Sequence, residues 1–278
     1  MNYLARVVVP IHKIDLTNGE KVSLLQCGKV LHEHPITVVA PEGLDVGHAL
    51  SLLTNGGASV NVRRFSEEAF ASLEGYNQLM LSREFYQTFE DAEYILIYQP
   101  DAFVFSDQLA EFCGMGYDYI GAPWFASFFG VSVSKRMVGA GNGGFSLRRV
   151  KACLDVLDYE GTFRPTDQLV SSNNSPVVKW KKLSSERRQS TVFAWSVKYF
   201  TAINSTTEDY FWAKDVPSTG IDFKVAPPEV AMAFSFEKHP SYLYQKMDGR
   251  LPFGCHAWEK YEYELFWRQM IAKYGYKL

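Results

Sequence analysis

The chain has 278 residues, of which 47% are hydrophobic and 15% aromatic, and its formal net charge is −3. This composition excludes a disordered or low-complexity protein, and a sequence pI of about 6.1 gives no support for a general nucleic-acid surface. No apolar run approaches the roughly 18 residues of a membrane helix, and the N-terminus enters a strand-like segment without a signal-peptide pattern. We therefore expect a cytosolic globular protein without a nucleic-acid partner.

Strand-like and helix-like segments alternate over the first hundred residues. The expected strands are 4–10, 36–39 (closed by Ala40-Pro41), 59–62 and 93–98, and the expected helices are 18–31, 44–53 and 76–89. Such alternation predicts an α/β fold, in which a mostly parallel, twisted, Rossmann-like sheet carries helices on both faces.

The second half of the chain is less regular. We expect a helix at 106–112, a short strand at 118–121 and then a loop rich in Phe, Ser and Gly from 122 to 135. The last twenty residues, from about Trp258, are expected to form one aromatic amphipathic helix that packs on the core. Because no internal repeat or interdomain linker is evident, residues 1–278 are predicted to form a single domain.

The four cysteines are scattered through the sequence and include no C-x-x-C pair. They are Cys27, Cys113, Cys153 and Cys255. Their spacing fits neither a zinc site nor a disulfide framework, so buried free thiols in a reducing cytosol are predicted.

The segment 93–105 contains an acidic residue directly after a buried strand. The run 94–98 lacks polar alternation, as expected for a central strand, and Pro100 ends it just before Asp101. In open α/β sheets, ligands bind at this carboxyl edge. Asp101 therefore either holds a divalent metal together with a diphosphate or caps the turn that follows the strand.

A glycine-rich segment, 139–149, contains Asn142, Gly143 and Gly144. It lacks the Lys-Ser/Thr of a phosphate-binding loop and lies too late in the chain for a dinucleotide fingerprint. Its glycines allow a close approach of the backbone to a ligand, and Asn142 offers a donor and an acceptor to sugar hydroxyls. The alternative is a tight turn before a strand.

Three further segments carry side chains with two possible roles. Glu208 and Asp209 follow Thr206 and Thr207, so they either occupy the first turn of a capped helix or supply a general base for a hydroxyl nucleophile. His256, in an aromatic turn bounded by glycine, either completes a metal site or is a structural histidine. The first strand ends in Val-Pro-Ile-His, where a nucleotide base could sit.

The order of these motifs resembles that of nucleotide-sugar-dependent glycosyltransferases of the GT-A fold. More narrowly, it is similar to a bacterial family catalogued as a domain of unknown function, with Gln-x-Asp, Asn-Gly-Gly-Phe-Ser-Leu-Arg, Glu-Asp and Gly-x-His-x-Trp segments. The order also parallels that of β-1,4-galactosyltransferase-type enzymes. The resemblance covers roughly residues 4 to 260.

The resemblance implies a glycosyltransferase that moves a sugar from a nucleotide diphosphate to a hydroxyl of a glycan or lipid-linked acceptor, in bacterial surface polysaccharide or glycoconjugate synthesis. Residues 1–105 would form the nucleotide-binding half and 106–278 the acceptor and sugar half. Asp101 and His256 would hold Mn²⁺ or Mg²⁺, Asp209 would be the base, and Glu208 would orient the acceptor or the base. The donor would be bound by Pro10, Ile11, His12, Asn77, Gln99, Asn142, Gly143 and Gly144.

Gln99 departs from the GT-A pattern, which has two acids as Asp-x-Asp. A glutamine can hydrogen-bond a ribose or a phosphate but is a poor metal ligand, so strict metal dependence does not follow. Two alternatives stay open, namely a non-catalytic nucleotide- or sugar-binding protein and a sugar nucleotidyltransferase. The latter would require a glycine-rich basic loop after the first strand, which residues 11–16 do not supply.

The segment 171–190 is polar and carries five basic residues around Trp180. The basic residues are Lys179, Lys181, Lys182, Arg187 and Arg188. A loop of this length is predicted to be functional or mobile. It is either a solvated surface loop or a flap that makes peripheral contact with an anionic membrane or a lipid-linked acceptor.

Overall fold

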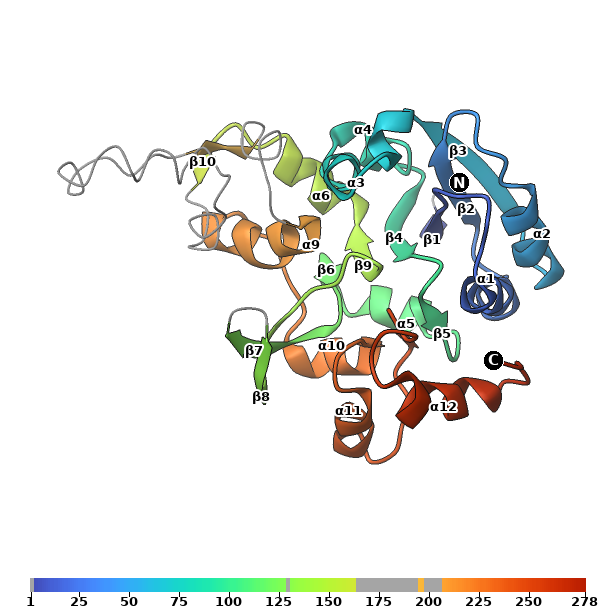
Figure 1. Cartoon of the computed structure of the whole chain (residues 1–278). Helices are drawn as coiled ribbons and strands as arrows, with labels where there is room; N and C mark the ends of the chain where they lie inside the picture. Colours follow the sequence, from blue (N-terminus) through green and yellow to red (C-terminus); the bar gives the residue numbers. More distant parts are fainter. Residues whose placement is uncertain (1–2, 129–130, 164–194, 198–206) are drawn as a thin grey trace.

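The computed structural model describes residues 3–128, 131–163, 195–197 and 207–278, and its centre is a six-stranded sheet of order β3-β2-β1-β4-β9-β6 (Figure 1). Its strands are β1 (Tyr3–Pro10), β2 (Ile36–Pro41), β3 (Val60–Phe65), β4 (Ala92–Tyr98), β6 (Tyr119–Ile120) and β9 (Phe145–Arg149). The pairs β1–β2, β1–β4 and β2–β3 are parallel, and β9 is antiparallel to both β4 and β6. The predicted α/β class with a mostly parallel sheet is confirmed.

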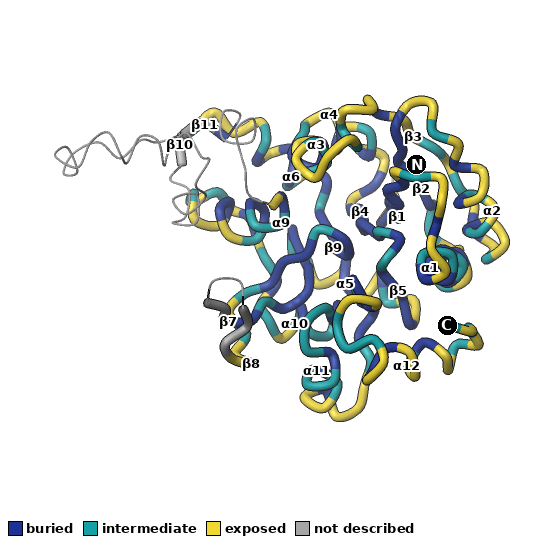
Figure 2. The backbone as a smooth tube through the Cα atoms, in the orientation of Figure 1, coloured by how far each residue is buried: buried dark blue, intermediate teal, exposed yellow. Residues whose placement is uncertain are grey.

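The runs 7–9 of β1 and 94–98 of β4 are apolar without interruption because both faces of these strands are covered. In β1, Val7 and Val9 belong to one hydrophobic cluster, whereas Val8 belongs to the cluster on the opposite face. In β4, Leu96 and Ile97 are divided in the same way. The buried tube segments of Figure 2 run through these strands at the middle of the molecule.

Helices cover both faces of the sheet, as predicted. One cluster includes residues of α1 (Asn18–Val30), α2 (Gly47–Asn55) and α5 (Leu109–Gly114). The other includes residues of α3 (Leu73–Met80), α4 (Arg83–Gln87) and α6 (Val150–Leu157). Helix α1 begins with a capping box, in which the Thr17 side chain accepts from Glu20 N–H and the Glu20 side chain accepts from Thr17 N–H.

A second, three-stranded sheet joins segments that are far apart in the sequence. Its strands are β5 (Phe103–Val104), β12 (Ser235–Phe236) and β13 (Gly254–Cys255). Strand β13 is parallel to β12 and antiparallel to β5. Phe103, Phe236 and Trp267 lie in a third hydrophobic cluster, which packs the C-terminal part of the chain on this sheet.

The remaining elements are mostly short. They are the 3-10 turns 67–70 and 216–219, the strands β10 (Thr162–Phe163) and β11 (Trp195–Ser196), the helices α9 (Glu208–Tyr210), α10 (Pro228–Phe234), α11 (Pro240–Lys246) and α12 (Arg268–Ala272), and the π-helical segments 211–215 and 263–267.

The single helix predicted for 76–89 is wrong, because the structure has two helices there. Helix α3 ends at Met80, and α4 begins at Arg83. The side chain of Ser82 accepts a hydrogen bond of 3.1 Å from Phe85 N–H and so caps the second helix. The apolar periodicity continues across this break, which is why the sequence suggested one element.

The predicted loop at 122–135 is also wrong, since a β-hairpin occupies this region. Strand β7 spans Pro123–Phe128, and β8 spans Val131–Ala140. The two strands pair antiparallel with irregular register near Trp124 and Phe125. The alternation of Val and Ser over 131–134 is a strand signal that the glycine and serine content of the region obscured.

The long C-terminal helix predicted from Trp258 is wrong in length. Glu262 has a left-handed backbone with φ of 54°, and helical structure is confined to the π-helical segment 263–267 and α12. The segment does pack on the core, because Trp267 and Ile271 are fully buried.

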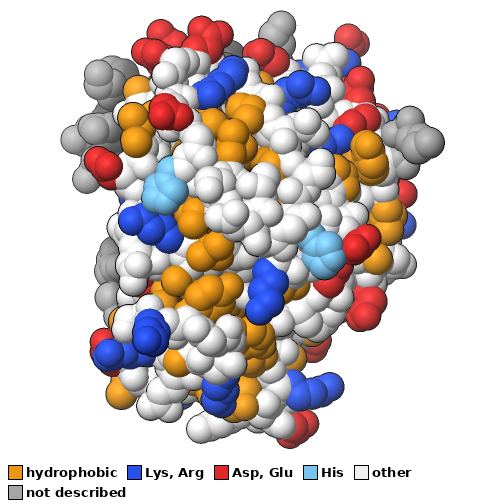
Figure 3. Space-filling model, turned by 90° about the vertical axis from the view of Figure 1, so that its right-hand side faces the viewer, with side chains coloured by type: hydrophobic (Ala, Val, Ile, Leu, Met, Phe, Trp, Pro, Cys, Tyr) orange, Lys and Arg blue, Asp and Glu red, His pale blue; other side chains and the backbone are white. Residues whose placement is uncertain are grey.

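All four cysteines are buried and free, as predicted. No helix in the described part of the chain is both long and apolar enough to cross a membrane. On the face shown in Figure 3, Lys and Arg side chains are scattered among acidic and apolar ones. The segment 171–190 lies outside the described residues, and the one-domain prediction with its two halves stays a prediction.

Candidate active site

The candidate site lies where β4 ends and β9 begins. Because β9 is antiparallel to β4, with Tyr98 opposite Phe145, the residues after β4 lie beside those before β9. The Gln99 N–H donates to the carbonyl of Gly144 at 2.8 Å. Strand β1 pairs with β4 through Val8 and Ile97, so the same register continued by two residues places Pro10 level with Gln99.

Asp101 and His256 meet because β5 and β13 pair. Phe103 is opposite Cys255, so the residues just before β5 lie beside those just after β13. Asp101 Oδ1 is 3.2 Å from His256 Nε2, and Gln99 Oε1 is 3.3 Å from the same nitrogen. The Asp101 side chain is 43% exposed, so its carboxylate is accessible to a ligand.

The second nitrogen of His256 faces Asn142 and Glu237. Asn142 Oδ1 accepts from the N–H groups of Gly144 (2.8 Å) and Phe145 (2.9 Å), which orients its amide nitrogen toward His256. That nitrogen is 3.2 Å from His256 Nδ1 and donates to Glu237 Oε2 at 3.1 Å. Glu237 Oε1 is 3.7 Å from Nδ1, so this ring nitrogen has both a donor and an acceptor beside it.

Charge and burial act in opposite directions on this pair. Burial lowers the pKa of His256, but the carboxylates of Asp101 and Glu237 outweigh it and raise the pKa to about 10. Burial raises the pKa of Asp101, yet His256 outweighs it, so the net shift is downward. The ion pair is therefore formed at neutral pH, and a metal would have to displace the proton on Nε2.

Glu208 lies in a fully buried ion pair. Its side chain is 2% exposed, its Oε2 is 2.8 Å from Arg148 Nη1, and its Oε1 accepts from Nη2 at 2.9 Å. Arg148 also donates to Tyr86 and Ser146. Burial raises the pKa of Glu208 to about 7, and Arg148 opposes that shift. The backbone N–H of Glu208 donates to Asn77 Oδ1 at 3.3 Å, so Asn77 positions the start of α9.

Asp209 is the more accessible acid of the two. Its Oδ1 accepts from Tyr210 N–H at 2.9 Å. Burial raises its pKa, and the negative charge of Glu237 raises it further. Glu237 is also a neighbour of His256, so Asp209 belongs to the same electrostatic environment as the Asp101–His256 pair.

Each glycine of the 139–149 segment that lies near the site makes room for a protein side chain. A Cβ at Gly144 would overlap the His256 imidazole and crowd Gln99 Oε1. A Cβ at Gly143 would crowd Glu208 Oε1, and one at Gly141 would overlap the indole of Trp124. The glycines thus allow these side chains to lie against the loop backbone.

Four neighbours of the site were not singled out as site residues from the sequence. They are Tyr76, Arg148, Glu237 and Trp124. The Tyr76 hydroxyl is buried beside the Gln99 side chain, and burial raises its pKa while the interaction with Gln99 lowers it. Tyr76 therefore supports the position of Gln99 in the site. A period-2 pattern could have revealed Arg148, since Ser146 and Arg148 alternate with the apolar Phe145 and Leu147.

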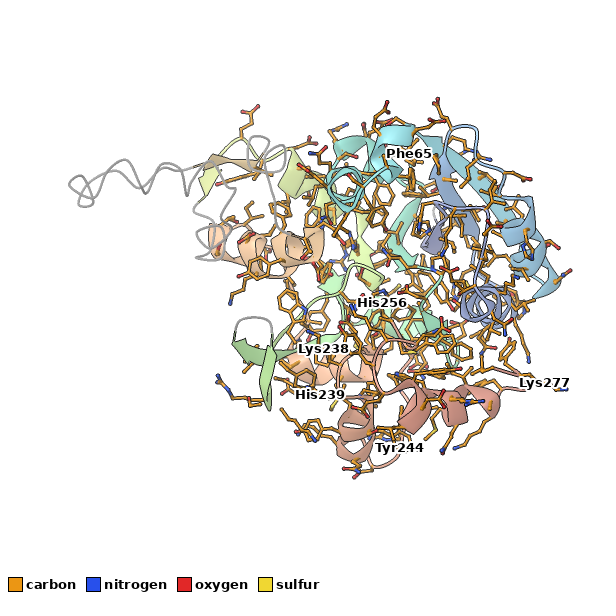
Figure 4. All side chains as sticks on the ribbon, viewed as in Figure 1. Phe65, Lys238, His239, Tyr244, His256 and Lys277 are labelled. Atoms are coloured by element: carbon orange, nitrogen blue, oxygen red, sulfur yellow. The ribbon has the colours of Figure 1, made fainter. Side chains whose placement is uncertain are left out.

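The predicted residues fall into three groups. The structure brings together Gln99, Asp101, Asn142, Gly144 and His256, and it joins Asn77, Gly143, Glu208 and Asp209 around α9. Pro10 and Ile11 are buried at the end of β1, whereas His12 is exposed and, within the described residues, makes no hydrogen bond or ion pair with the first group. In Figure 4, His256 lies near the centre of the molecule, and Lys238 lies between it and the β7–β8 hairpin.

The donor set fits a cation that is completed by a substrate. Two ligands roughly 2.1 Å from one ion at a right angle are about 3 Å apart, close to the 3.2 Å between Asp101 Oδ1 and His256 Nε2. The described residues contain no group of three or more His, Cys, Asp or Glu that could hold a metal. Two protein ligands suffice only where substrate phosphates supply the others.

The family described as "Protein of unknown function (DUF5672)" matches residues 59–256, which is more than half of the chain and includes both acids of α9 and His256. The chain belongs to this family. A comparison with curated proteins found no match.

Three solved structures are similar to this chain at low identity. The S. aureus TarS structure has 13% identity and a TM-score of 0.38 over 56% of this chain and 30% of that one. Core-mannan synthase A (CmsA/Ktr4) from Aspergillus fumigatus, in its Mn/GDP form, has 11% identity and a TM-score of 0.34 over 45% of this chain and 43% of that one. A glycosyltransferase involved in glycosylation of the major capsid of PBCV-1 has 10% identity and a TM-score of 0.43 over 97% of this chain and 98% of that one. The chain thus spans less than half of the first two, and function must be argued from the site.

Proposed function

We propose that this protein is a GT-A-like glycosyltransferase that uses a nucleotide-diphosphate sugar. The observation that carries the proposal is the convergence of Asp101 and His256 at the carboxyl edge of the sheet, with Asn142 against the same imidazole. Each comes from a different segment, and this edge is where open α/β sheets bind ligands. A carboxylate beside an imidazole, with an exposed oxygen, suits a cation and a diphosphate better than it suits a structural turn.

The donor would lie along the end of β4. Pro10, Ile11 and His12 would border the base, while Gln99 and Asn142 offer amide groups to the ribose, phosphate or sugar. Asp101 and His256 would hold the divalent cation, Mn²⁺ or Mg²⁺, which when bound would act as a Lewis acid toward the diphosphate leaving group. Glu237 lies behind the imidazole, in the place where metal-bound histidines commonly have a carboxylate partner.

The acceptor step follows from the two acids of α9. Asp209 would take the proton of the acceptor hydroxyl while the hydroxyl oxygen bonds to the anomeric carbon of the donor sugar. The bond from that carbon to the phosphate oxygen would break, and its electron pair would stay on the diphosphate. Burial raises the pKa of Asp209, which makes its carboxylate a stronger base. Glu208 is held by Arg148, so its role would be to position Asp209 rather than to exchange protons.

Two alternative functions are tested by the same experiment. A sugar nucleotidyltransferase would need a basic glycine-rich loop after β1, but this connection leads directly into the capping box of α1. A non-catalytic sugar- or nucleotide-binding protein could retain the same residues, with Gln99 as the mark of lost metal binding. The resemblance noted in the sequence extends our proposal to a glycan or lipid-linked acceptor in bacterial surface polysaccharide or glycoconjugate synthesis.

The test is a thermal-shift screen of the full chain with UDP and GDP, each with and without Mn²⁺, followed by hydrolysis assays with the matching nucleotide sugars. We expect one nucleotide to raise the Tm, and to do so more with Mn²⁺. Ligand at 100 times its Kd stabilises a protein by about 2.7 kcal/mol. Hydrolysis of the donor should then be detectable. Binding without hydrolysis or transfer would instead identify a non-catalytic binding protein, and pyrophosphate release from UTP or GTP with a sugar phosphate would identify a nucleotidyltransferase.

A further inference from the structure

A stacked aromatic pair lies directly beside the candidate base. The rings of Trp124, from β7, and Tyr210, from α9, have centroids 5.8 Å apart and planes inclined by 18°. Tyr210 follows Asp209 in the chain, and its N–H donates to Asp209 Oδ1 at 2.9 Å. The pair is therefore tied to the carboxylate that would activate an acceptor.

Trp124 differs from the other tryptophans whose side chains the structure describes. Trp212, Trp258 and Trp267 are fully buried. Trp124 and its partner Tyr210 are each only partly buried. Leaving part of a large ring in water forgoes hydrophobic stabilisation, so partly exposed aromatic rings next to polar groups are typical of binding surfaces.

The orientation of the Trp124 ring is fixed by the glycine-rich segment. The indole lies against the backbone at Gly141, where a Cβ would overlap it, and a Cβ at Gly139 would lie 3.5 Å from it. Gly141 directly precedes Asn142, which contacts His256. One segment thus contacts both Trp124 and the candidate donor site, which gives the indole a defined position relative to the reaction.

We propose that Trp124 and Tyr210 form the acceptor subsite and that it binds an uncharged pyranose ring. This inference rests on the proposed function and names its acceptor class. A pyranose has an apolar face of C–H groups that can stack on an aromatic ring, and hydroxyls around its rim that need acceptors. Asp209, which accepts from Tyr210 N–H, supplies a carboxylate at this place, and Glu237 supplies another beside Asn142 and His256. Their charges favour a neutral sugar over an anionic one.

The experiment is saturation-transfer NMR with a panel of methyl pyranosides in the gluco, galacto, manno and N-acetylglucosamine forms. It uses the full chain with UDP or GDP and Mn²⁺, and saturates the aromatic protons of the protein. Sorbitol and 1-octanol serve as probes without a sugar ring. We expect transfer to the C–H protons of at least one pyranoside, with neither comparison probe matching it. Trp124→Ala and Tyr210→Ala should each weaken its binding roughly tenfold, and Trp124→Phe should weaken it less.

Tyr3→Ala is the matched control, because Tyr3 is a partly exposed aromatic residue at the amino end of β1, and it should leave pyranoside binding unchanged. A cooperative melting curve for each variant verifies that it is folded. Unchanged pyranoside binding in folded Trp124→Ala and Tyr210→Ala, or stronger binding of 1-octanol, would overturn the subsite. If the wild type binds the nucleotide and hydrolyses a donor but binds no pyranoside, only this inference fails. If it binds no nucleotide, the proposed function fails and the inference with it.

Discussion

Asp101 Oδ1 lies 3.2 Å from His256 Nε2 because the short strands β5 and β13 pair antiparallel, with Phe103 opposite Cys255. These two strands belong to a three-stranded sheet, β12-β13-β5, that is separate from the central one. The candidate metal ligands therefore flank two paired strands, and the His256 N–H also donates to the Phe236 carbonyl at 3.0 Å.

Replacing Asp101 by alanine should abolish the part of nucleotide binding that depends on Mn²⁺ while leaving the protein folded. The alanine removes the accessible carboxylate but leaves the β5–β13 pairing intact. The measurement is the Tm shift with nucleotide, with and without Mn²⁺. Asp107→Ala is the matched control, because Asp107 forms an equivalent pair with His34 outside the site, with Oδ2 2.9 Å from Nε2. An Mn²⁺-dependent shift that survives in Asp101→Ala would remove Asp101 from the metal site.

The same pair predicts how stability depends on pH in the absence of metal. The pKa of His256 is raised from 6.5 to about 10, so the folded protein holds a proton that the unfolded chain releases. The stabilisation is fully present below pH 6.5 and is lost as the pH rises toward 10. Urea unfolding of wild type and Asp101→Asn over this range should show the wild-type advantage shrinking with rising pH. An advantage that grows with pH would contradict the assigned ion pair.

Gly144→Ala should disturb the site although it adds only one methyl group. The new Cβ would overlap the His256 imidazole and crowd Gln99, so the imidazole must shift from its position beside Asp101. We expect weaker nucleotide binding and a lower Tm, measured by titration calorimetry and melting, because the ion pair with Asp101 is disturbed. The control is Gly114→Ala, at the end of α5, where nothing lies within 4 Å of the added Cβ. Equal affinities for the two variants would show that the imidazole position does not matter.

Glu208→Ala should destabilise the protein strongly, because it leaves Arg148 charged and unpaired at 0% exposure. Breaking a buried ion pair costs about 3–5 kcal/mol, whereas removing both partners costs much less. Urea unfolding of Glu208→Ala and of the double variant Glu208→Leu with Arg148→Met measures the difference. Asp155→Ala, in the exposed pair with Lys151, should change stability by less than about 1 kcal/mol. A small loss of unfolding free energy in Glu208→Ala would mean that water reaches Arg148 in the variant.

Local sequence pattern was sufficient for the parallel strands of the central sheet, whereas β9 was not among the expected strands. The runs 7–9 in β1 and 94–98 in β4 are unbroken and apolar, and such runs have few alternatives in a chain that also contains amphipathic helices. The break at Ser82 was missed because one capping serine interrupts the backbone without interrupting the apolar periodicity. The β7–β8 hairpin was missed because glycine and serine are typical of loops.

The candidate site depended on motif order rather than on local pattern. Gln99 and His256 are 157 positions apart, and nothing near either one indicates the other. The same is true of Arg148 and Glu208, 60 positions apart, because the alternation around Arg148 indicates a strand but not the residue that Arg148 pairs with. Asn142 was chosen for its hydrogen-bonding groups, but the structure shows that these groups first orient its own loop and His256.

Asp209→Asn tests the proposed general base most directly. The amide keeps the shape of the carboxylate and can still accept from Tyr210 N–H, so the start of α9 should be unchanged. It cannot take a proton, and transfer to an acceptor hydroxyl should fall by roughly 10²–10⁴ with nucleotide affinity preserved. The pH profile adds a second criterion, since the loss of transfer at low pH in the wild type should reflect protonation of Asp209, whose pKa is raised mainly by burial. Turnover near the wild-type rate in Asp209→Asn would remove Asp209 from the mechanism and leave its carboxylate only the role of an acid in the first turn of α9.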